Sequence, residues 1–339
     1  MKKVSVVVPA YNSHDTLARC LGSLVNQTLQ DIEIIVVNDC STDDTWEIMK
    51  RCENQFPDKV IIIDSKENRG AGGARNIGFD MASGEYIGLV DSDDYVATNM
   101  YELLYNKAKE CDYDMVDSGY YHESTDTATI FTGDNVTGTL DAGKRDILIT
   151  AGGYLVTRIF KNELWNNPKI RMREKVRCLE DSEILTYMIM RSECIGNVKE
   201  ILYRYCDTKD SATKDEEFES YLQSIIGAIK ALFEVTHNLE HYEENRIAVE
   251  YEMAQLYNYG INRCLRDNIV RYGASIDKID MYFKGLDVPE KEKLIELAAL
   301  AHKVIKTPYR DNRFTIKKIP ELDIAIMETS DRNFGHGSL

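Results

Sequence analysis

The first hundred residues alternate short apolar runs with stretches of helical periodicity, and this alternation restricts the fold more than any other feature. The apolar runs lack the polar alternation of strands that face water on one side, so they are typical of buried parallel strands. They lie at 4–10, 32–37, 60–64 and 85–90. Repeated β-α units predict an α/β fold: a doubly wound, mostly parallel sheet flanked by helices, with ligands at the carboxyl ends of the strands.

The second half of the chain shows a different organisation. A helical pattern covers 178–190, a strand-like run covers 201–206, and helical patterns predominate from about residue 216 onward. The polar, charged stretch at 206–217 predicts a boundary. We therefore expect a first domain at 1–212, an added helical C-terminal region at 213–330 and a disordered tail at 331–339.

Composition excludes several classes of protein. The net charge of −16 argues against nucleic acid as a partner, because phosphate backbones need a basic face. No apolar run approaches the roughly 18 residues of a membrane span, and Pro9, Tyr11 and Asn12 interrupt the N-terminal run, which we interpret as a strand and not a signal peptide. The eight cysteines are scattered singly, so neither a zinc module nor a disulfide framework is indicated and a cytoplasmic location is expected.

Three carboxylates crowd the end of the fourth apolar run, in the sequence Asp91-Ser92-Asp93-Asp94. Hard carboxylate oxygens held this close repel one another unless a cation lies beside them, and they are the ligands that Mg²⁺ or Mn²⁺ prefers. A solvated acidic turn ahead of the helix near residue 99 is the alternative for such a motif taken alone.

Four segments in order, VSVVVPAYN, IEIIVVNDCSTDDT, ENRGAGGARNIG and GEYIGLVDSDDY, together resemble the family 2 glycosyltransferases. The resemblance covers about residues 3–120 closely and 150–211 more loosely. It implies a GT-A fold, with a nucleotide-sugar half at 1–118 and an acceptor half at 119–212. It also implies inverting transfer of a sugar from a nucleotide diphosphate-sugar to an acceptor hydroxyl, in cell-surface polysaccharide biosynthesis.

The resemblance assigns roles to the donor side. Asp39 would contact the base, and because a carboxylate can accept the imide N–H of uracil, UDP-sugars are the favoured donors. Asp93 would ligate Mn²⁺ or Mg²⁺. The remaining nucleotide-side residues are Pro9 and Tyr11 at the base, Arg75 at the diphosphate, Asp91 at the ribose and the metal's outer shell, and Ser92 within the acidic motif. A packed loop aromatic is the alternative for Tyr11, Asp94 is expected to hydrogen-bond locally, and Asn38 departs from the Asp-Asp that the family often has at 38–39.

Asp181, in the sequence LEDSE, matches the family's general base, which takes the proton of the acceptor hydroxyl. The alternative for Glu180-Asp181 is an acid pair at a helix N-terminus, favoured by the macrodipole. Arg204 and Ser211 are weaker candidates for contact with the diphosphate.

Other functions fit less well. A dinucleotide-binding dehydrogenase is disfavoured because Arg75 stands where the glycine-rich fingerprint needs glycine. A nucleotidyltransferase of similar architecture would need a glycine-rich stretch after the first strand, where this chain has PAYNSHDT. A non-catalytic nucleotide-sugar-binding module remains as an alternative.

The expected partners are a UDP-sugar and a glycan or lipid-linked acceptor. The helical C-terminal region would shape the acceptor side or form a homodimer contact. Residues 299–320 carry a net charge of +5, which suggests peripheral contact with anionic lipid at the inner face of the membrane. A solvated basic face that pairs with the acidic body is the alternative.

Overall fold

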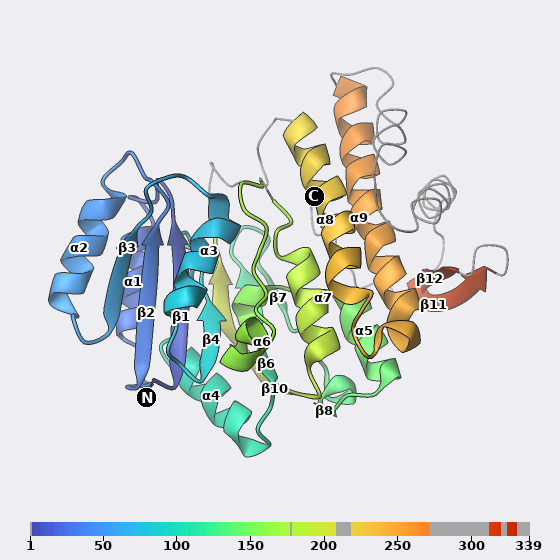
Figure 1. The fold of residues 1–339 in the computed structure, drawn as a ribbon, viewed down its shortest axis with the longest axis horizontal. Helices are drawn as coiled ribbons and strands as arrows, with labels where there is room; N and C mark the ends of the chain where they lie inside the picture. Colours follow the sequence, from blue (N-terminus) through green and yellow to red (C-terminus); the bar gives the residue numbers. More distant parts are fainter. Residues whose placement is uncertain (1, 177, 208–217, 271–311, 320–323, 331–339) are drawn as a thin grey trace. The chain divides into compact units, whose positions relative to one another are not determined.

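The computed structural model describes residues 2–176, 178–207, 218–270, 312–319 and 324–330. The chain divides into two compact units, Met1–Glu216 and Glu217–Leu339 (Figure 1). The proposed disordered tail at 331–339, and all of the basic stretch 299–320 except 312–319, lie outside the described residues.

The N-terminal unit is built on one mixed ten-stranded sheet flanked by helices, in the order β3-β2-β1-β4-β9-β6-β10-β5, with β7 beside β6 and β8 beside β10. The ladders from β3 to β4 are all parallel, as is the ladder between β6 and β10. The strands are β1 (Val4–Ala10), β2 (Ile32–Asn38), β3 (Val60–Asp64), β4 (Tyr86–Leu89), β5 (Tyr95–Val96), β6 (Met115–His122), β7 (Thr127–Thr129), β8 (Gly138–Thr139), β9 (Arg158–Lys161) and β10 (Cys194–Tyr205). This arrangement confirms the α/β fold.

Helices connect these strands and cover the sheet. They are α1 (Leu17–Val25), α2 (Thr45–Gln55), α3 (Gly70–Met81), α4 (Met100–Glu110), α5 (Ala142–Ala151), α6 (Asn162–Asn166) and α7 (Ser182–Arg191). Every residue of β1 and β2 is buried, which is why their sequences are continuous apolar runs. Helix α3 packs across β1 and β2 and carries the glycine-rich segment (Figure 1).

The C-terminal unit contains two long helices, α8 (Phe218–Thr236) and α9 (Tyr242–Val270). It also contains an antiparallel strand pair, β11 (Asn312–Ile319) and β12 (Ile324–Ser330). The expectation of a helical region over 213–330 was wrong for these two segments. β11 carries the β-branched residues Thr315, Ile316 and Ile319, and β12 carries Ile at the alternate positions 324 and 326. β-branched residues favour strands. None of the helices in the described part of the chain is long and apolar enough to span a membrane.

Gly78 lets α3 approach the sheet closely. A Cβ atom at this position would lie 2.3 Å from Cγ1 of Val7, a fully buried residue in β1. We expect Gly78→Ala to lower the free energy of unfolding by about 1–3 kcal/mol through overpacking. Urea denaturation followed by circular dichroism measures this.

Gly22, in helix α1, provides the matched control, because nothing lies within 4 Å of a Cβ built there. Gly22→Ala is expected to raise the free energy of unfolding by about 0.5–1 kcal/mol, the helix-propensity gain of alanine. Equal effects of the two substitutions would contradict the close packing at Gly78.

Candidate functional site

The carboxyl ends of β2 and β4, the two strands that flank β1, place acidic residues at one edge of the sheet. Asp39 follows β2, and its backbone N–H donates to the carbonyl of Ala10 at the end of β1, at 2.8 Å. Asp91 follows β4, on the other side of β1, where the N–H of Val90 donates to the carbonyl of Val7. The end of β1 therefore lies between these two acids, at the edge where α/β sheets bind ligands.

Asp39 lies in a pocket of backbone amides. The residue is 2% exposed, and its Oδ1 accepts a hydrogen bond from the N–H of Arg69 at 2.8 Å. Burial raises the pKa of Asp39, although the amides of Arg69 and Gly70 oppose this. Pro9 is buried at the end of β1, whereas Tyr11 is 50% exposed, so Tyr11 is not the packed loop aromatic that the sequence left open.

Asn38 has a structural reason to be an amide. Its Nδ2 donates to Oδ1 of Asp64 at 2.6 Å, and its Oδ1 accepts from the N–H of Ser41 at 3.2 Å. An aspartate at position 38 would have no proton to donate and would set two carboxylates against each other. The departure from Asp-Asp thus secures the contact between the ends of β2 and β3.

Arg75 joins the two halves of the site. Its two terminal nitrogens donate to Oδ1 of Asp91 at 2.6 Å and to Oε1 of Glu180 at 2.7 Å. The side chain is 9% exposed. Burial opposes the charge on Arg75, but the carboxylates of Asp91 and Glu180 outweigh this and hold its pKa above the ordinary value. The contact between Arg75 and Glu180 spans 105 residues and was not predicted from the sequence, in which Glu180 was only one of an acid pair ahead of a helix.

The acidic motif after β4 is divided between the interior and the surface. Asp94 is 1% exposed, and it accepts hydrogen bonds from the hydroxyl of Tyr203 at 2.5 Å and the N–H of Cys206 at 2.7 Å. Burial, together with the nearby negative charges of Asp91 and Asp93, raises the pKa of Asp94 to about 8. The backbone N–H of Asp94 bonds locally, to the carbonyl of Asp91 at 3.1 Å, but the expectation was wrong for its side chain, whose partners lie on and just after β10.

The other two residues of the motif have partners of their own. The hydroxyl of Ser92 lies 2.8 Å from that of Ser13, and the backbone carbonyl of Asp93 accepts from Arg19 at 2.7 Å. Both contacts attach the motif to the segment that follows β1, so its position depends on the part of the chain that includes Pro9, at the end of β1, and Tyr11, just after it.

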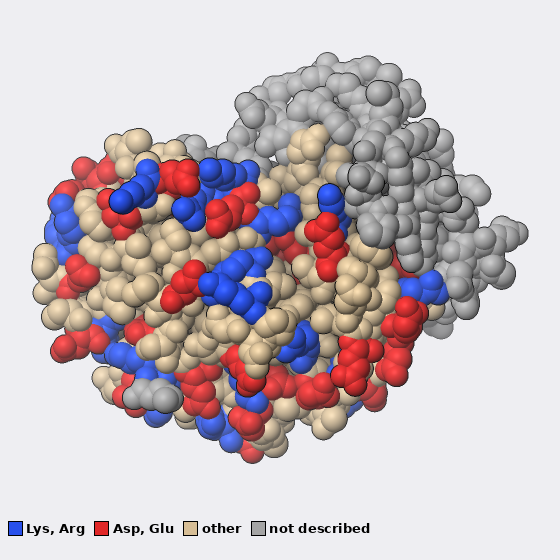
Figure 2. Space-filling view, viewed as in Figure 1, with Lys and Arg blue, Asp and Glu red and all other residues tan. Residues whose placement is uncertain are grey.

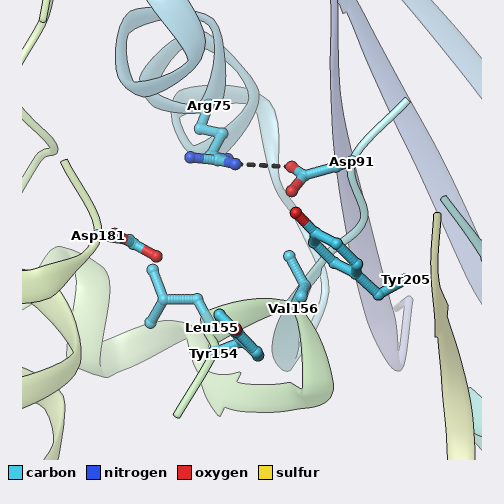
Figure 3. A pocket seen from close by; sticks show the side chains of 7 residues that line it. All are labelled: Arg75, Asp91, Tyr154, Leu155, Val156, Asp181 and Tyr205. Carbon is cyan, nitrogen blue, oxygen red and sulfur yellow. Dashed lines mark hydrogen bonds and ion pairs between the residues drawn. The ribbon is translucent and has the colours of Figure 1, made fainter. Parts of the chain in front are cut away.

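A cavity opens between the two halves of the N-terminal unit (Figure 3). Its lining residues are Arg75, Asp91, Tyr154, Leu155, Val156, Asp181 and Tyr205. Figure 3 shows the Arg75–Asp91 ion pair on one side of the cavity, and Asp181 across from it. The structure thus brings three predicted site residues, Arg75, Asp91 and Asp181, to one cavity. Asp39, Pro9, Tyr11, Ser92 and Asp93 are not among its lining residues.

Asp181 occupies the N-cap position of helix α7, the position that the alternative for Glu180-Asp181 assigned to an acid. Burial and the negative charge of Glu180 raise the pKa of Asp181 to about 6, and the positive charge of Arg75 opposes this rise. A carboxyl with this pKa is largely ionised at pH 7 but is a stronger base than an ordinary aspartate.

The lining residues Tyr154, Leu155, Val156 and Tyr205 were not found from the sequence. The sequence does contain one indication for Tyr154, Leu155 and Val156, because the pair Gly152-Gly153 precedes them. The positive φ angles of these glycines, 67° and 123°, mark a sharp turn in the chain. Of the weaker candidates, Arg204 lies over the ring of Tyr121 at 4.9 Å and not at the cavity, whereas Ser211 lies outside the described residues.

Protein side chains by themselves do not form a complete metal site in the described part of the chain, where no three His, Cys, Asp or Glu residues are grouped to hold an ion. Asp91 and Asp93 nevertheless supply hard oxygens close enough to affect the pKa of Asp94. Mg²⁺ characteristically takes only one or two carboxylates when substrate phosphates complete its shell. The donor set fits an ion that arrives with a diphosphate.

Comparison with known proteins identifies the family. The model of the family described as Glycosyl transferase family 2 matches residues 5–176, just over half of the chain. The chain belongs to this family.

Two curated relatives and one solved structure illustrate the match. The uncharacterized glycosyltransferase EpsJ of Bacillus subtilis is 32% identical over 221 residues, which cover 62% of this chain and 63% of EpsJ. A poly(ribitol-phosphate) beta-glucosyltransferase of Bacillus spizizenii is 30% identical over 248 residues, covering 68% of this chain and 37% of that protein. The chain therefore matches less than two thirds of the length of each of these relatives.

The solved structure is that of S. aureus TarS 1-349 in complex with UDP-GlcNAc. It superposes with a TM-score of 0.68 at 20% identity and covers 93% of this chain and 94% of that one. This likeness establishes that the two proteins share the GT-A fold, as the sequence analysis expected.

Replacing Arg75 tests whether its ion pairs with Asp91 and Glu180 stabilise the fold. In Arg75→Met the partly buried carboxylates of Asp91 and Glu180 lose their counter-charge, so we expect the free energy of unfolding to fall by about 2–4 kcal/mol. Chemical denaturation measures this loss.

Lys50→Met is the matched control, since Lys50 pairs with Glu47 on the exposed face of α2, where both side chains are at least 41% exposed. We expect that control to change stability by less than about 0.5 kcal/mol. Similar small losses in both variants would show that the bridge at Arg75 is not structural.

Proposed function

We propose that the protein is an inverting, metal-dependent glycosyltransferase that moves a sugar from a UDP-sugar to a hydroxyl of a glycan or lipid-linked acceptor. The observation that carries this proposal is the cavity in which Asp181, a carboxylate of raised pKa, lies across from the Arg75–Asp91 pair. In this arrangement the base that would act on the acceptor, Asp181, lies on one side of the cavity, and the Arg75–Asp91 pair, beside which the donor would bind, lies on the other.

The nucleotide is proposed to bind at the ends of β1 and β2. The Asp39 carboxylate would accept the imide N–H of uracil, while Pro9 and the half-exposed Tyr11 would line the base. The UDP-GlcNAc complex of TarS, which has the same fold, supports a uridine nucleotide as the donor.

The diphosphate is proposed to lie at the acidic motif. Asp93 would hold Mn²⁺ or Mg²⁺, with Asp91 at the ribose and the ion's outer shell, and Ser92 would lie in the wall beside them. When bound, the ion supplies positive charge that stabilises the departing diphosphate. Arg75 contributes its own charge from behind Asp91, since its terminal nitrogens are held by Asp91 and Glu180.

Asp181 is proposed as the general base. It would accept the proton of the acceptor hydroxyl as the new glycosidic bond forms on the face opposite the departing diphosphate. Attack from that face inverts the anomeric configuration. Helix α7 holds Asp181 at its N-terminus, and burial together with the neighbouring charge of Glu180 raises the pKa of the Asp181 carboxyl.

The biological setting is proposed from the same family membership. The Bacillus spizizenii relative is named for glucosylation of poly(ribitol-phosphate), which supports a role in cell-surface polysaccharide biosynthesis. We propose a cytoplasmic location with peripheral membrane contact through 299–320. The C-terminal unit would serve the acceptor side or a homodimer. Release of UDP from a UDP-sugar distinguishes this enzyme from a non-catalytic nucleotide-sugar-binding module, and from a nucleotidyltransferase, which would release pyrophosphate.

Two substitutions separate the donor role from the base role. Asp93→Asn is expected to weaken Mg²⁺-dependent binding of UDP by more than tenfold, measured by calorimetry, because it removes a carboxylate ligand. Asp181→Asn is expected to leave UDP binding within about twofold but to lower the rate of UDP release from a UDP-sugar by at least a hundredfold.

The exposed Asp58 gives a charge-matched control. It precedes the amino end of β3, whereas the acids of the site follow the carboxyl ends of β2 and β4. Asp58→Asn should change neither quantity. Equal loss of UDP binding in the Asp93 and Asp181 variants would refute the assigned roles.

The rate should also depend on pH through Asp181. Its carboxyl acts only when ionised, so UDP release should fall about tenfold per pH unit below a midpoint near pH 6. Glu180→Gln should move this midpoint to lower pH, because the negative charge of Glu180 raises the pKa of Asp181. Rates measured from pH 4.5 to 8.5 would reveal the shift.

Glu47→Gln, on the exposed surface of α2, should leave the profile unchanged. A midpoint that persists in Asp181→Asn, in whatever activity remains, would assign the titration to another group.

A further inference from the structure

Five aromatic rings form a connected cluster at one end of the cavity. Tyr154 lies at its centre, with ring centroids 5.1 Å from Tyr120, 5.7 Å from Phe131 and 6.3 Å from Tyr205. His122 extends the cluster, 4.7 Å from Tyr205. We refer to these five residues as the aromatic cluster.

Tyr154 is unusual in this cluster because it is held by three rings and yet remains 38% exposed. Tyr154 and Tyr205 both line the cavity, and their rings are near parallel, at 15°. Leu155 and Val156 complete an apolar wall beside them, and Figure 3 shows this wall facing the space between Asp181 and the Arg75–Asp91 pair. The cavity therefore has an aromatic and aliphatic side next to the proposed base.

The buried ion pair between Arg158 and Asp117 holds the backbone of Tyr154 in place. Arg158 donates to the carbonyl of Tyr154 at 2.9 Å and to Oδ2 of Asp117 at 3.1 Å, and both charged side chains are 1% exposed. Thr132 and Thr157 donate to the same carboxylate. The position of Tyr154 is thus set before any ligand arrives, which lowers the entropy that binding must overcome.

The charges around the cavity select against an anionic group beside the aromatic wall. Arg75 is the one cationic side chain among the described residues that line the cavity, and Asp91 and Glu180 already occupy both of its terminal nitrogens. Asp181 and Asp91 add negative charge. A phosphate on the acceptor at this point would meet two carboxylates and no unengaged lining cation.

We propose that the sugar unit that accepts the new bond is a neutral pyranose, whose C–H face stacks on Tyr154 with Tyr205 at its edge. Its reacting hydroxyl would then point toward Asp181. An aromatic face carries negative potential and attracts the weakly positive C–H groups of a sugar ring while shielding apolar surface from water. This inference rests on the proposed function and narrows it, because a phosphodiester-linked polyol such as ribitol phosphate lacks both the ring and the neutrality.

Saturation-transfer difference NMR on the full-length chain with Mg²⁺ and UDP tests this proposal. The probes are the methyl β-pyranosides of glucose, galactose and N-acetylglucosamine, with ribitol 5-phosphate as the acyclic, charged competitor. We expect transfer to the ring C–H protons of at least one pyranoside and none to ribitol 5-phosphate. Tyr154→Ala should reduce the pyranoside signal at least fivefold, and Tyr154→Phe, which keeps the ring, should retain at least half of it.

Tyr121→Ala is the matched control. Tyr121 follows Tyr120 on β6, points to the opposite face of the sheet and lies against Arg204, away from the cavity. It should leave the pyranoside signal unchanged.

Transfer to the uracil and ribose protons of UDP is read in the same samples. UDP signals in Tyr154→Ala equal to those of the unsubstituted protein show that the fold and the nucleotide site are intact. If UDP binds but no pyranoside does, if ribitol 5-phosphate binds instead, or if Tyr154→Ala binds pyranosides normally, the pyranose subsite is refuted while the donor site stands. The absence of UDP signals in the unsubstituted protein would refute the proposed function itself.

Discussion

The bridge from Arg75 to Asp91 and Glu180 is the interaction on which the site depends. One guanidinium, emerging from α3, holds the end of β4 and the segment that leads into α7. These pieces lie 16 and 105 residues from Arg75 in the sequence. Without a shared cation the two carboxylates would repel each other across the cavity. With it, the acid of the donor side and the acid beside the proposed base are kept at a fixed separation.

The same bridge balances the electrostatics of Asp181. Glu180 raises the pKa of Asp181 and Arg75 lowers it, and both act from the same ion pair. Burial adds the largest upward contribution. The proposed base is therefore tuned by residues that need not touch the substrate. Buried charges of this kind lower the stability of the fold, and they are found mainly at functional sites.

The parallel half of the fold could be predicted from the sequence because its strands are buried on both faces. Their apolar runs carry the signal locally, and Asp39 and Asp91 could be assigned to one edge because parallel strands end there. The antiparallel strand β9 could not be predicted in the same way. It is four residues long, and it is a strand because it pairs with β4 and β6, which lie far from it in the chain.

The cavity was predictable only in part, for a similar reason. Asp181 was reached through resemblance to a family, but Tyr154 and Tyr205 face the cavity because of the buried Asp117–Arg158 pair and the course of β10. Asp94 shows the limit clearly: its local sequence indicated a turn, whereas its partners are more than one hundred residues away. Contacts of this range leave no periodic trace in a sequence.

The strand order also fixes when each half of the sheet can assemble during synthesis. The ladders β3-β2-β1-β4 use only residues 4–89, so they can pair as soon as that stretch has left the ribosome. β6 cannot join them until β9, at residues 158–161, is available to insert between β4 and β6. Throughout that interval the open edge of β4 is an apolar strand edge without its partner, the feature that promotes misassociation of nascent chains.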